Sequence, residues 1–157
     1  MKITLLVIGK IDDSYLLDGI DKYLKRLKHY IKFDIQILPD IKKTKNLTEQ
    51  EQKNKEAELF LKFIQPQDDI ILLDDKGAEL SSKRFADLLN KKMIASVGHL
   101  VFLVGGPYGF DNSIYQRANQ KLSLSKLTFS HQMVRLFFVE QVYRAFTILK
   151  SEPYHHE

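Results

Sequence analysis

The sequence predicts an α/β fold with a single domain, built on a parallel β-sheet that helices cover on both faces. Apolar segments of strand length alternate with helical segments along all 157 residues. Two of the strand segments, residues 70–74 and 99–104, are continuous apolar runs, which are typical of strands buried on both faces. With 44% hydrophobic and 28% charged residues, the chain has the composition of one compact domain with a real core.

The first half of the chain alternates between strands and helices. Strands are expected at residues 3–9 (ITLLVIG), 33–38 (FDIQIL) and 70–74 (IILLD). In residues 14–31 the large apolar side chains recur at spacings of three and four, which predicts an amphipathic helix with lysines on its opposite face. The run from Thr48 to Glu51 is a capping box that begins a helix reaching about Ile64. The Lys-rich residues 39–47 form the loop before it.

The second half continues the alternation. Two further helices are expected to begin at side-chain caps, provided by Ser81 or Ser82 and by Asp111 or Asn112. The remaining segments are a strand at residues 99–104 (HLVFLV), an extended stretch at 121–129 (KLSLSKLTF) and the longest, most apolar helix at 132–150. Because that last helix is apolar nearly all round, part of it is expected to be buried against a second copy of the chain in a two-fold dimer.

The composition also limits the class of protein. There is no cysteine, which excludes disulfides, thiolate metal sites and cysteine nucleophiles and is consistent with a reducing cytoplasm. No apolar run approaches the roughly 18 residues that would span a bilayer. The first residues, MKITLLVIGK, lead directly into charged positions without a small-residue cleavage site, so they are expected to be a strand rather than a signal peptide. We therefore expect a cytoplasmic protein.

The chain is moderately basic, with a net charge of +4 and a pI of about 9.1. Basic residues gather in its first third, at Lys22, Lys25, Arg26, Lys28, Lys32, Lys42, Lys43 and Lys45. Such a concentration favours attraction to a phosphate backbone. Solvated helix faces and a loop explain it equally well, so charge alone does not decide.

Residues 101–110 (VFLVGGPYGF) are a buried strand that runs into three glycines within five positions. In an open parallel sheet, ligands bind beyond the carboxyl ends of the strands. Three segments lie at such ends, namely residues 73–77, 105–109 and 122–129. The glycine loop lacks the sequence of a phosphate-binding loop, and Pro107 removes an N–H that a phosphate would need, so a nucleoside with little phosphate is the expected ligand. A tight strand-to-helix turn would also explain the glycines.

Three late motifs carry a specific resemblance. VGGPYGF, LSLSKLTFSHQMVRLFFVEQVYRAF and the ending PYHHE, together with MKITLLVIGK at the start, resemble the ribosomal RNA large subunit methyltransferase H family, the small branch of the SPOUT methyltransferases. The resemblance covers residues 1–157 as one domain. It implies a parallel-sheet SPOUT fold with a C-terminal trefoil knot, a homodimer, and S-adenosyl-L-methionine as the methyl donor. The implied reaction methylates N3 of a pseudouridine in 23S ribosomal RNA within the assembled 70S ribosome.

The resemblance also assigns cofactor-binding positions. They fall on Leu73, Gly105, Leu124, Ser125, Lys126, Leu127, Thr128 and Phe129. These positions belong to the three strand-end segments described above. Backbone groups of the loops and apolar side chains suit an adenine ring, and we expect the cofactor to approach the backbone most closely at Gly105.

Methyl transfer from a sulfonium requires positioning and the loss of the imide proton of the base, and it requires no metal. By the resemblance, the expected catalytic residues are Glu140, Arg144, Tyr154, His155 and His156. Glu140 and Arg144 are four positions apart, which favours an ion pair on one helical face. A purely structural role would also explain that pair, because charges near a core or a dimer interface are normally paired. The sequence leaves open which residue removes the proton.

The sequence departs from the family pattern at two positions. Ser130 stands where the family usually has proline, and His156 stands where it has Arg or Lys. His131 is expected to act as a cap or hinge before the last helix, and Asp74 with Asp75 is expected to form a turn. Two rival functions stay open: a SPOUT-type methyltransferase acting on tRNA, and a ribosome-binding module without activity.

Overall fold

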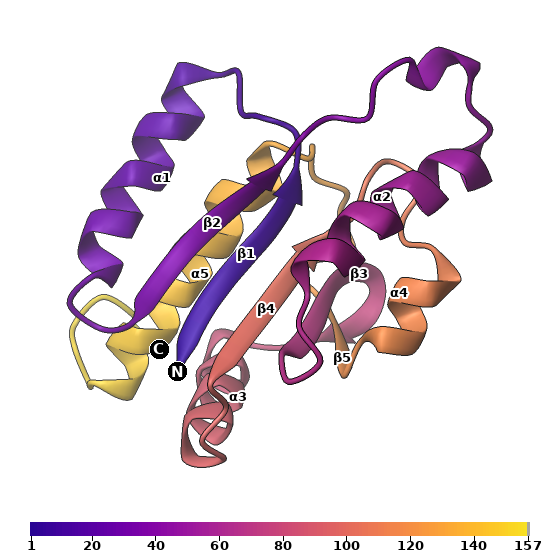
Figure 1. The fold of residues 1–157 in the computed structure, drawn as a ribbon. Coiled ribbons are helices and arrows are strands. Elements are labelled where there is room, and N and C mark those ends of the chain that lie inside the picture. Colours follow the sequence, from indigo (N-terminus) through magenta and orange to yellow (C-terminus); the bar gives the residue numbers. More distant parts are fainter. Residues whose placement is uncertain (157) are drawn as a thin grey trace.

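The computed structural model describes residues 1–156 and contains, within them, a five-stranded sheet with the order β2-β1-β4-β3-β5 (Figure 1). The strands are β1 (Lys2–Ile8), β2 (Lys32–Leu38), β3 (Asp69–Glu79), β4 (His99–Val104) and β5 (Gln120–Ser123). Every neighbouring pair is parallel. The predicted parallel sheet is confirmed.

Helices cover both faces of this sheet (Figure 1). They are α1 (Ser14–Leu27), α2 (Glu49–Phe63), α3 (Ser82–Ile94), α4 (Asn112–Arg117) and α5 (Met133–Leu149), with a short 3₁₀ helix at Thr44–Asn46. One apolar core lies between the sheet and α1, α3 and α5, and a second lies between the sheet and α2 and α4. Because β1, β3 and β4 supply buried side chains to both cores, residues 3–7, 70–73 and 100–104 are apolar at every position except Thr4.

The predicted helix starts are confirmed. Thr48 and Glu51 form the reciprocal bonds of a capping box, Ser81 accepts the N–H of Arg84, and Asp111 accepts the N–H of Ser113. The first helix ends four residues earlier than predicted. Its last turn tightens at His29 and Tyr30, whose N–H groups donate to carbonyls three positions back, and the chain then turns into β2.

Two expectations near the carboxyl ends of the strands are wrong. The extended stretch expected at 121–129 ends as a strand at Ser123, because Ser123 and Ser125 hydrogen-bond the following backbone and bend the chain. The turn expected at Asp74 lies inside β3, which continues to Glu79. There the pairing with β5 shifts register, and a Cβ on Gly77 would lie 2.6 Å from the backbone nitrogen of Leu122.

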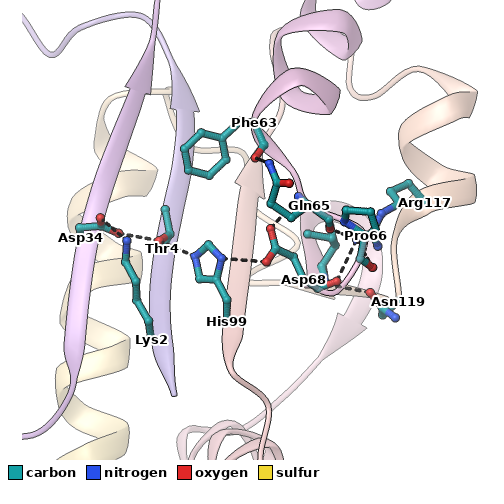
Figure 2. Close-up of polar contacts among 11 residues, drawn as sticks. Lys2, Thr4, Asp34, Phe63, Gln65, Pro66, Asp68, His99, Arg117 and Asn119 are labelled. Carbon is teal, nitrogen blue, oxygen red and sulfur yellow. Dashed lines mark hydrogen bonds and ion pairs between the residues drawn. The ribbon is translucent and has the colours of Figure 1, made fainter.

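A polar network crosses the sheet at the end where its strands begin (Figure 2). The fully buried hydroxyl of Thr4 donates to Asp34, and its oxygen lies 2.9 Å from Nε2 of His99. Nδ1 of His99 lies 2.9 Å from a carboxylate oxygen of the buried Asp68. Thr4, His99 and Asp68 therefore have the connectivity of a nucleophilic triad. Since no substrate can reach Thr4 and its hydrogen is donated to Asp34, the network ties strands together and does not perform catalysis.

Thr4→Val is expected to lower the free energy of unfolding by about 2 kcal/mol, because it removes a fully buried hydroxyl that bonds both His99 and the partly exposed Asp34. Thr147→Val is the matched control. Thr147 is equally buried, but its hydroxyl bonds only the carbonyl of Arg144 within α5, so a change below about 0.5 kcal/mol is expected. Guanidinium denaturation measures both. Equal losses in the two variants would contradict a special role for the network.

Candidate cofactor cavity and catalytic cluster

A cavity of about 440 Å³ lies at the carboxyl ends of β3, β4 and β5. Its wall includes all of the residues that the resemblance assigns to the cofactor: Leu73, Gly105, Leu124, Ser125, Lys126, Leu127, Thr128 and Phe129. The glycine loop and the segment after β5 face each other across it. Tyr108 and Leu127 are 47% and 77% exposed and stand at its rim. The three strand-end segments chosen from sequence therefore converge on one site.

The glycines of the loop have separate structural causes. Gly109 has a φ of 78°, which residues with a side chain rarely adopt. A Cβ on Gly105 would lie 3.1 Å from the ring of Phe110, and a Cβ on Gly106 would lie 2.3 Å from the carboxylate of Glu56. The ring of Phe110 therefore occupies the space into which a side chain at position 105 would point. Only the backbone of Gly105 is left to face the cavity.

Tyr115 and Asp74 connect two walls of the same cavity. The hydroxyl of Tyr115, on α4, donates to the carboxylate of Asp74, on β3. Burial and this bond raise the pKa of Tyr115 to about 12, so the hydroxyl keeps its hydrogen at neutral pH. The Asp74 carboxylate also accepts the N–H of Lys76. Asp74 is therefore fixed in place on the cavity wall.

Four of the five residues expected at the reaction centre form one cluster. Glu140 accepts a hydrogen bond of 2.6 Å from Arg144, which confirms the predicted ion pair, and one of 2.9 Å from the hydroxyl of Tyr154. The guanidinium of Arg144 lies 4.8 Å from the centre of the Tyr154 ring and 3.3 Å from Nδ1 of His155. His156, the fifth residue, is exposed.

Residues that were not predicted hold this cluster. Tyr23, on α1, lies within 3.3 Å of the Tyr154 hydroxyl, and the ring of Tyr143 packs edge-on against Tyr154 at 4.8 Å. Burial, then the bonds to Tyr23 and Glu140, raise the pKa of Tyr154, so it acts as a neutral donor. The bond to Glu140 raises the pKa of Arg144. Aromatic residues at 23 and 143 lie 120 positions apart in the sequence, so no local pattern pairs them.

The cluster and the cavity lie at different positions along α5. Val134, in the first turn of the helix, lines the cavity, whereas Tyr154 is bonded to Glu140 in the middle of the helix. Figure 1 shows α5 packed against the sheet. At 1.5 Å per residue, Glu140 and Arg144 lie about 9 and 15 Å beyond Val134 along the helix axis. None of the cluster's described residues lines the cavity. Within one chain, the structure does not bring the two predicted parts of the site together.

A second cavity, of about 390 Å³, shares a wall with the first. The shared wall consists of Val104, Gly105, Gly106, Pro107 and His131, which line both. His131 lies in a turn just before α5, and its carbonyl accepts a bond from the side chain of Arg135.

Two buried charged residues form the inner part of this second cavity. Arg135 donates to the carbonyls of Ile8 and Gly9 at 2.8 and 2.7 Å. Burial lowers its pKa. Glu56 is only 5% exposed. Sequence reasoning missed Glu56, although a signal existed: it lies on the same face of α2 as the buried Phe60, four positions on.

The described residues, 1–156, contain neither a membrane-spanning helix nor a cluster of metal ligands. No helix in that range is long and apolar enough to cross a membrane. No group of three or more His, Asp or Glu side chains in that range has the arrangement of a metal site.

Comparison with known proteins identifies close relatives. The family model described as "Predicted SPOUT methyltransferase" matches residues 1–155. The chain is 57% identical over 157 residues to the ribosomal RNA large subunit methyltransferase H of Parabacteroides distasonis, and equally identical to that of Flavobacterium psychrophilum, covering 100% of each chain in both cases. The one of Christiangramia forsetii is 56% identical over 156 residues, covering 99% of each.

A solved structure supports the fold. A probable methylase family protein from Haemophilus influenzae matches with a TM-score of 0.50 and 14% sequence identity, over 95% of this chain and 66% of that chain. At this identity the likeness concerns the fold alone. It agrees with the parallel sheet and its covering helices.

Proposed function

The chain belongs to the ribosomal RNA large subunit methyltransferase H family of SPOUT methyltransferases, and on that basis we propose that it methylates N3 of pseudouridine 1915 in 23S ribosomal RNA. The observation that carries this proposal is identity of 57% over the full length of relatives with that name. Residues 1–157 act as one domain, in the cytoplasm, on the assembled 70S ribosome. The same identity disfavours a tRNA substrate and a module without activity.

The residues around the first cavity fit S-adenosyl-L-methionine. Leu73, Leu124 and Leu127 offer apolar surface for the flat adenine ring, and loop backbone groups are available for its polar edge. Pro107 has no N–H, so the loop is unsuited to phosphate and suited to a cofactor that carries none. When bound, the cofactor supplies an activated methyl group on a sulfonium. The task of this chain is to orient that group and the base and to receive a proton.

A homodimer would unite the two halves of the site. No residue of the Glu140–Arg144–Tyr154 cluster lines the cavity of its own chain, which supports a site in which the cluster serves the cavity of another subunit. Apolar side chains are available for the contact: Phe137 on α5 is 44% exposed and lies against Phe129 of the cavity wall. We propose a two-fold dimer in which one subunit's cluster completes its partner's site.

A trefoil knot belongs to the same proposal. The glycine loop and residues 124–129, which are the segments that would form the knot, both line the first cavity. Family membership supports the knot, because the fold shared with other SPOUT proteins carries the cofactor in such a loop crossing. Exposed Lys22, Lys28 and Lys32 on and after α1 support attraction to ribosomal RNA.

Methylation assays with different substrates test the proposed function. The purified protein and methyl-labelled S-adenosylmethionine are incubated with 70S ribosomes from cells that lack the modification, and with total tRNA. We expect label in 23S RNA of the ribosomes and none in tRNA. Label in tRNA, or in neither substrate, would refute the proposal.

Gly105→Ala is expected to weaken cofactor binding about tenfold, equivalent to about 1.4 kcal/mol. The new methyl group would lie 3.1 Å from the Phe110 ring, and this ring, which lines the cavity, must move to make room. The cost in folding is about 1 kcal/mol, as for a mildly overpacked core. Titration calorimetry with S-adenosylmethionine gives the affinity.

Gly98→Ala is the control for this variant. Nothing lies within 4 Å of the position of its Cβ, and the residue precedes β4 at the other end of the sheet. The cofactor affinity and the stability of Gly98→Ala should equal those of the unaltered protein. Unchanged affinity in Gly105→Ala would remove the glycine loop from the binding site.

A further inference from the structure

The second cavity is placed to hold the other reactant of the methyl transfer. It shares Val104, Gly105, Gly106, Pro107 and His131 with the cavity that fits the cofactor. In an in-line displacement, the nucleophile and the leaving group lie on opposite sides of the transferred methyl group. The two cavities meet at these five residues, so a base held in one would lie beside a methyl group carried in the other.

The shape and polarity of the second cavity suit a nucleobase. Its volume is about 390 Å³. Ile8, Ile41 and Pro107 provide apolar surface for the face of a ring, and polar groups surround them. The exposed residues of its wall include Lys10, Asp12, Asp40 and Thr44, and the buried ones include Glu56 and Arg135. The cavity is therefore open to solvent on one side and carries charged groups on both its outer and its inner wall.

Glu56 is the buried carboxylate of this cavity, and no ion pair to it is found among the described residues. Arg135 is committed to the carbonyls of Ile8 and Gly9 and of His131, and no ion pair between it and Glu56 occurs in the described chain. The Glu56 carboxylate accepts neutral donors only: the side-chain amide of Gln52 at 3.1 Å and the backbone N–H of Gly106. Two oxygens provide about four acceptor positions, so capacity remains for a donor inside the cavity.

We propose that the second cavity receives the target uracil ring and that Glu56 accepts its N3 proton. This inference rests on the proposed function, and it deepens it by naming the base that the sequence left open. The proton on N3 passes to the carboxylate of Glu56, and the electron pair left on N3 forms the new bond to the methyl carbon. The bond from that carbon to sulfur breaks, and sulfur keeps the electron pair as a neutral thioether. No further reactant is needed.

The burial of Glu56 supports its role as the proton acceptor. It raises the pKa of Glu56, while the bonds from Gln52 and Gly106 and the charge of His131 act in the opposite direction. A carboxylate with a raised pKa is a stronger proton acceptor than an exposed one. The charged groups that surround it come from three other segments of the chain, namely Lys10 and Asp12, Asp40, and His131 with Arg135.

Glu56 also touches the glycine loop directly, since a Cβ on Gly106 would lie 2.3 Å from its carboxylate. A purely structural role for Glu56 would be to hold that loop. Glu56→Gln separates the two roles, because glutamine keeps an oxygen that accepts the N–H of Gly106 but cannot take a proton. Glu58→Gln is the matched control, on the same helix but exposed.

The experiment compares the two variants with the unaltered protein in single-turnover methylation of 70S ribosomes that lack the modification, from pH 5.5 to 9. Cofactor affinity is measured by calorimetry, and the thermal stability of each variant is measured alongside. In the unaltered protein, the rate should fall as pH falls through the pKa of Glu56, because the protonated carboxyl cannot accept a proton. In Glu56→Gln the rate at pH 7 should be about 100-fold lower, and it should rise with pH throughout, as the base ionises without help. Cofactor affinity should change less than threefold.

The outcomes are distinct. The loss of rate in Glu56→Gln, with affinity kept and the pH profile changed, supports the inference, provided that Glu58→Gln behaves as the unaltered protein. An unchanged rate overturns it, and so does a parallel loss of cofactor affinity, which would mean that Glu56 only holds the loop. If the unaltered protein does not methylate ribosomes, the proposed function fails and this inference fails with it.

Discussion

Deleting residues 154–157 is expected to abolish methylation of ribosomes while the fold and cofactor affinity stay nearly intact. The deletion removes Tyr154 and His155 from the cluster with Glu140 and Arg144. The cofactor cavity keeps every lining residue. We expect a rate loss of about 1,000-fold, the size of effect that positioned donors have in active sites. Lost hydrogen bonds lower the free energy of unfolding by only about 1–2 kcal/mol.

Single-turnover methylation and cofactor calorimetry measure the two effects separately. His156→Arg is the control within the tail, since His156 is exposed and the family usually has a basic residue there. It should retain nearly full activity. Full activity in the truncated protein would remove the tail from the active site.

Mixing two inactive subunits is expected to restore activity. One subunit lacks residues 154–157, and the other carries Leu124→Trp, whose large ring fills the cofactor cavity. Each homodimer should be inactive. In mixed dimers, the intact tail of the blocked subunit completes the intact cavity of the truncated one, so an equal mixture should reach about a quarter of full activity, given random pairing and one working site in each mixed dimer.

Coexpression with two different affinity tags provides the mixed dimers. Subunits that each carry both changes are the control, because they contain no intact cavity and should remain inactive in any mixture. If each site were built within a single chain, the mixed dimers would be inactive too. That result would refute the composite site, and a monomer in sedimentation velocity would refute the dimer itself.

Local sequence patterns predicted most of the fold. The capping box at Thr48 and the alternation of strands and helices are local features, and each is found in the structure. The ion pair of Glu140 and Arg144 followed from a spacing of four positions on one helix. The continuous apolar strands predicted a sheet covered on both faces, because strands between two cores have no polar face.

Features that depend on distant parts of the chain were not predicted. The support of Tyr154 by Tyr23 depends on how α1 and α5 pack, and the exposure of Glu56 to a cavity depends on where the glycine loop crosses α2. The separation of the tail cluster from the cavity is also a three-dimensional fact, since both belong to one continuous resemblance in sequence.

Mass spectrometry of ribosomal RNA tests the central claim most directly. RNA from cells with the protein, from cells without it, and from deleted cells that regain it is digested to nucleosides and to oligonucleotides. We predict that methylation at N3 of pseudouridine 1915 disappears from 23S RNA when the protein is absent and returns when it is restored, with every other methylated nucleoside unchanged. Methylation that persists at this nucleotide without the protein, or that disappears instead from tRNA, would contradict the account.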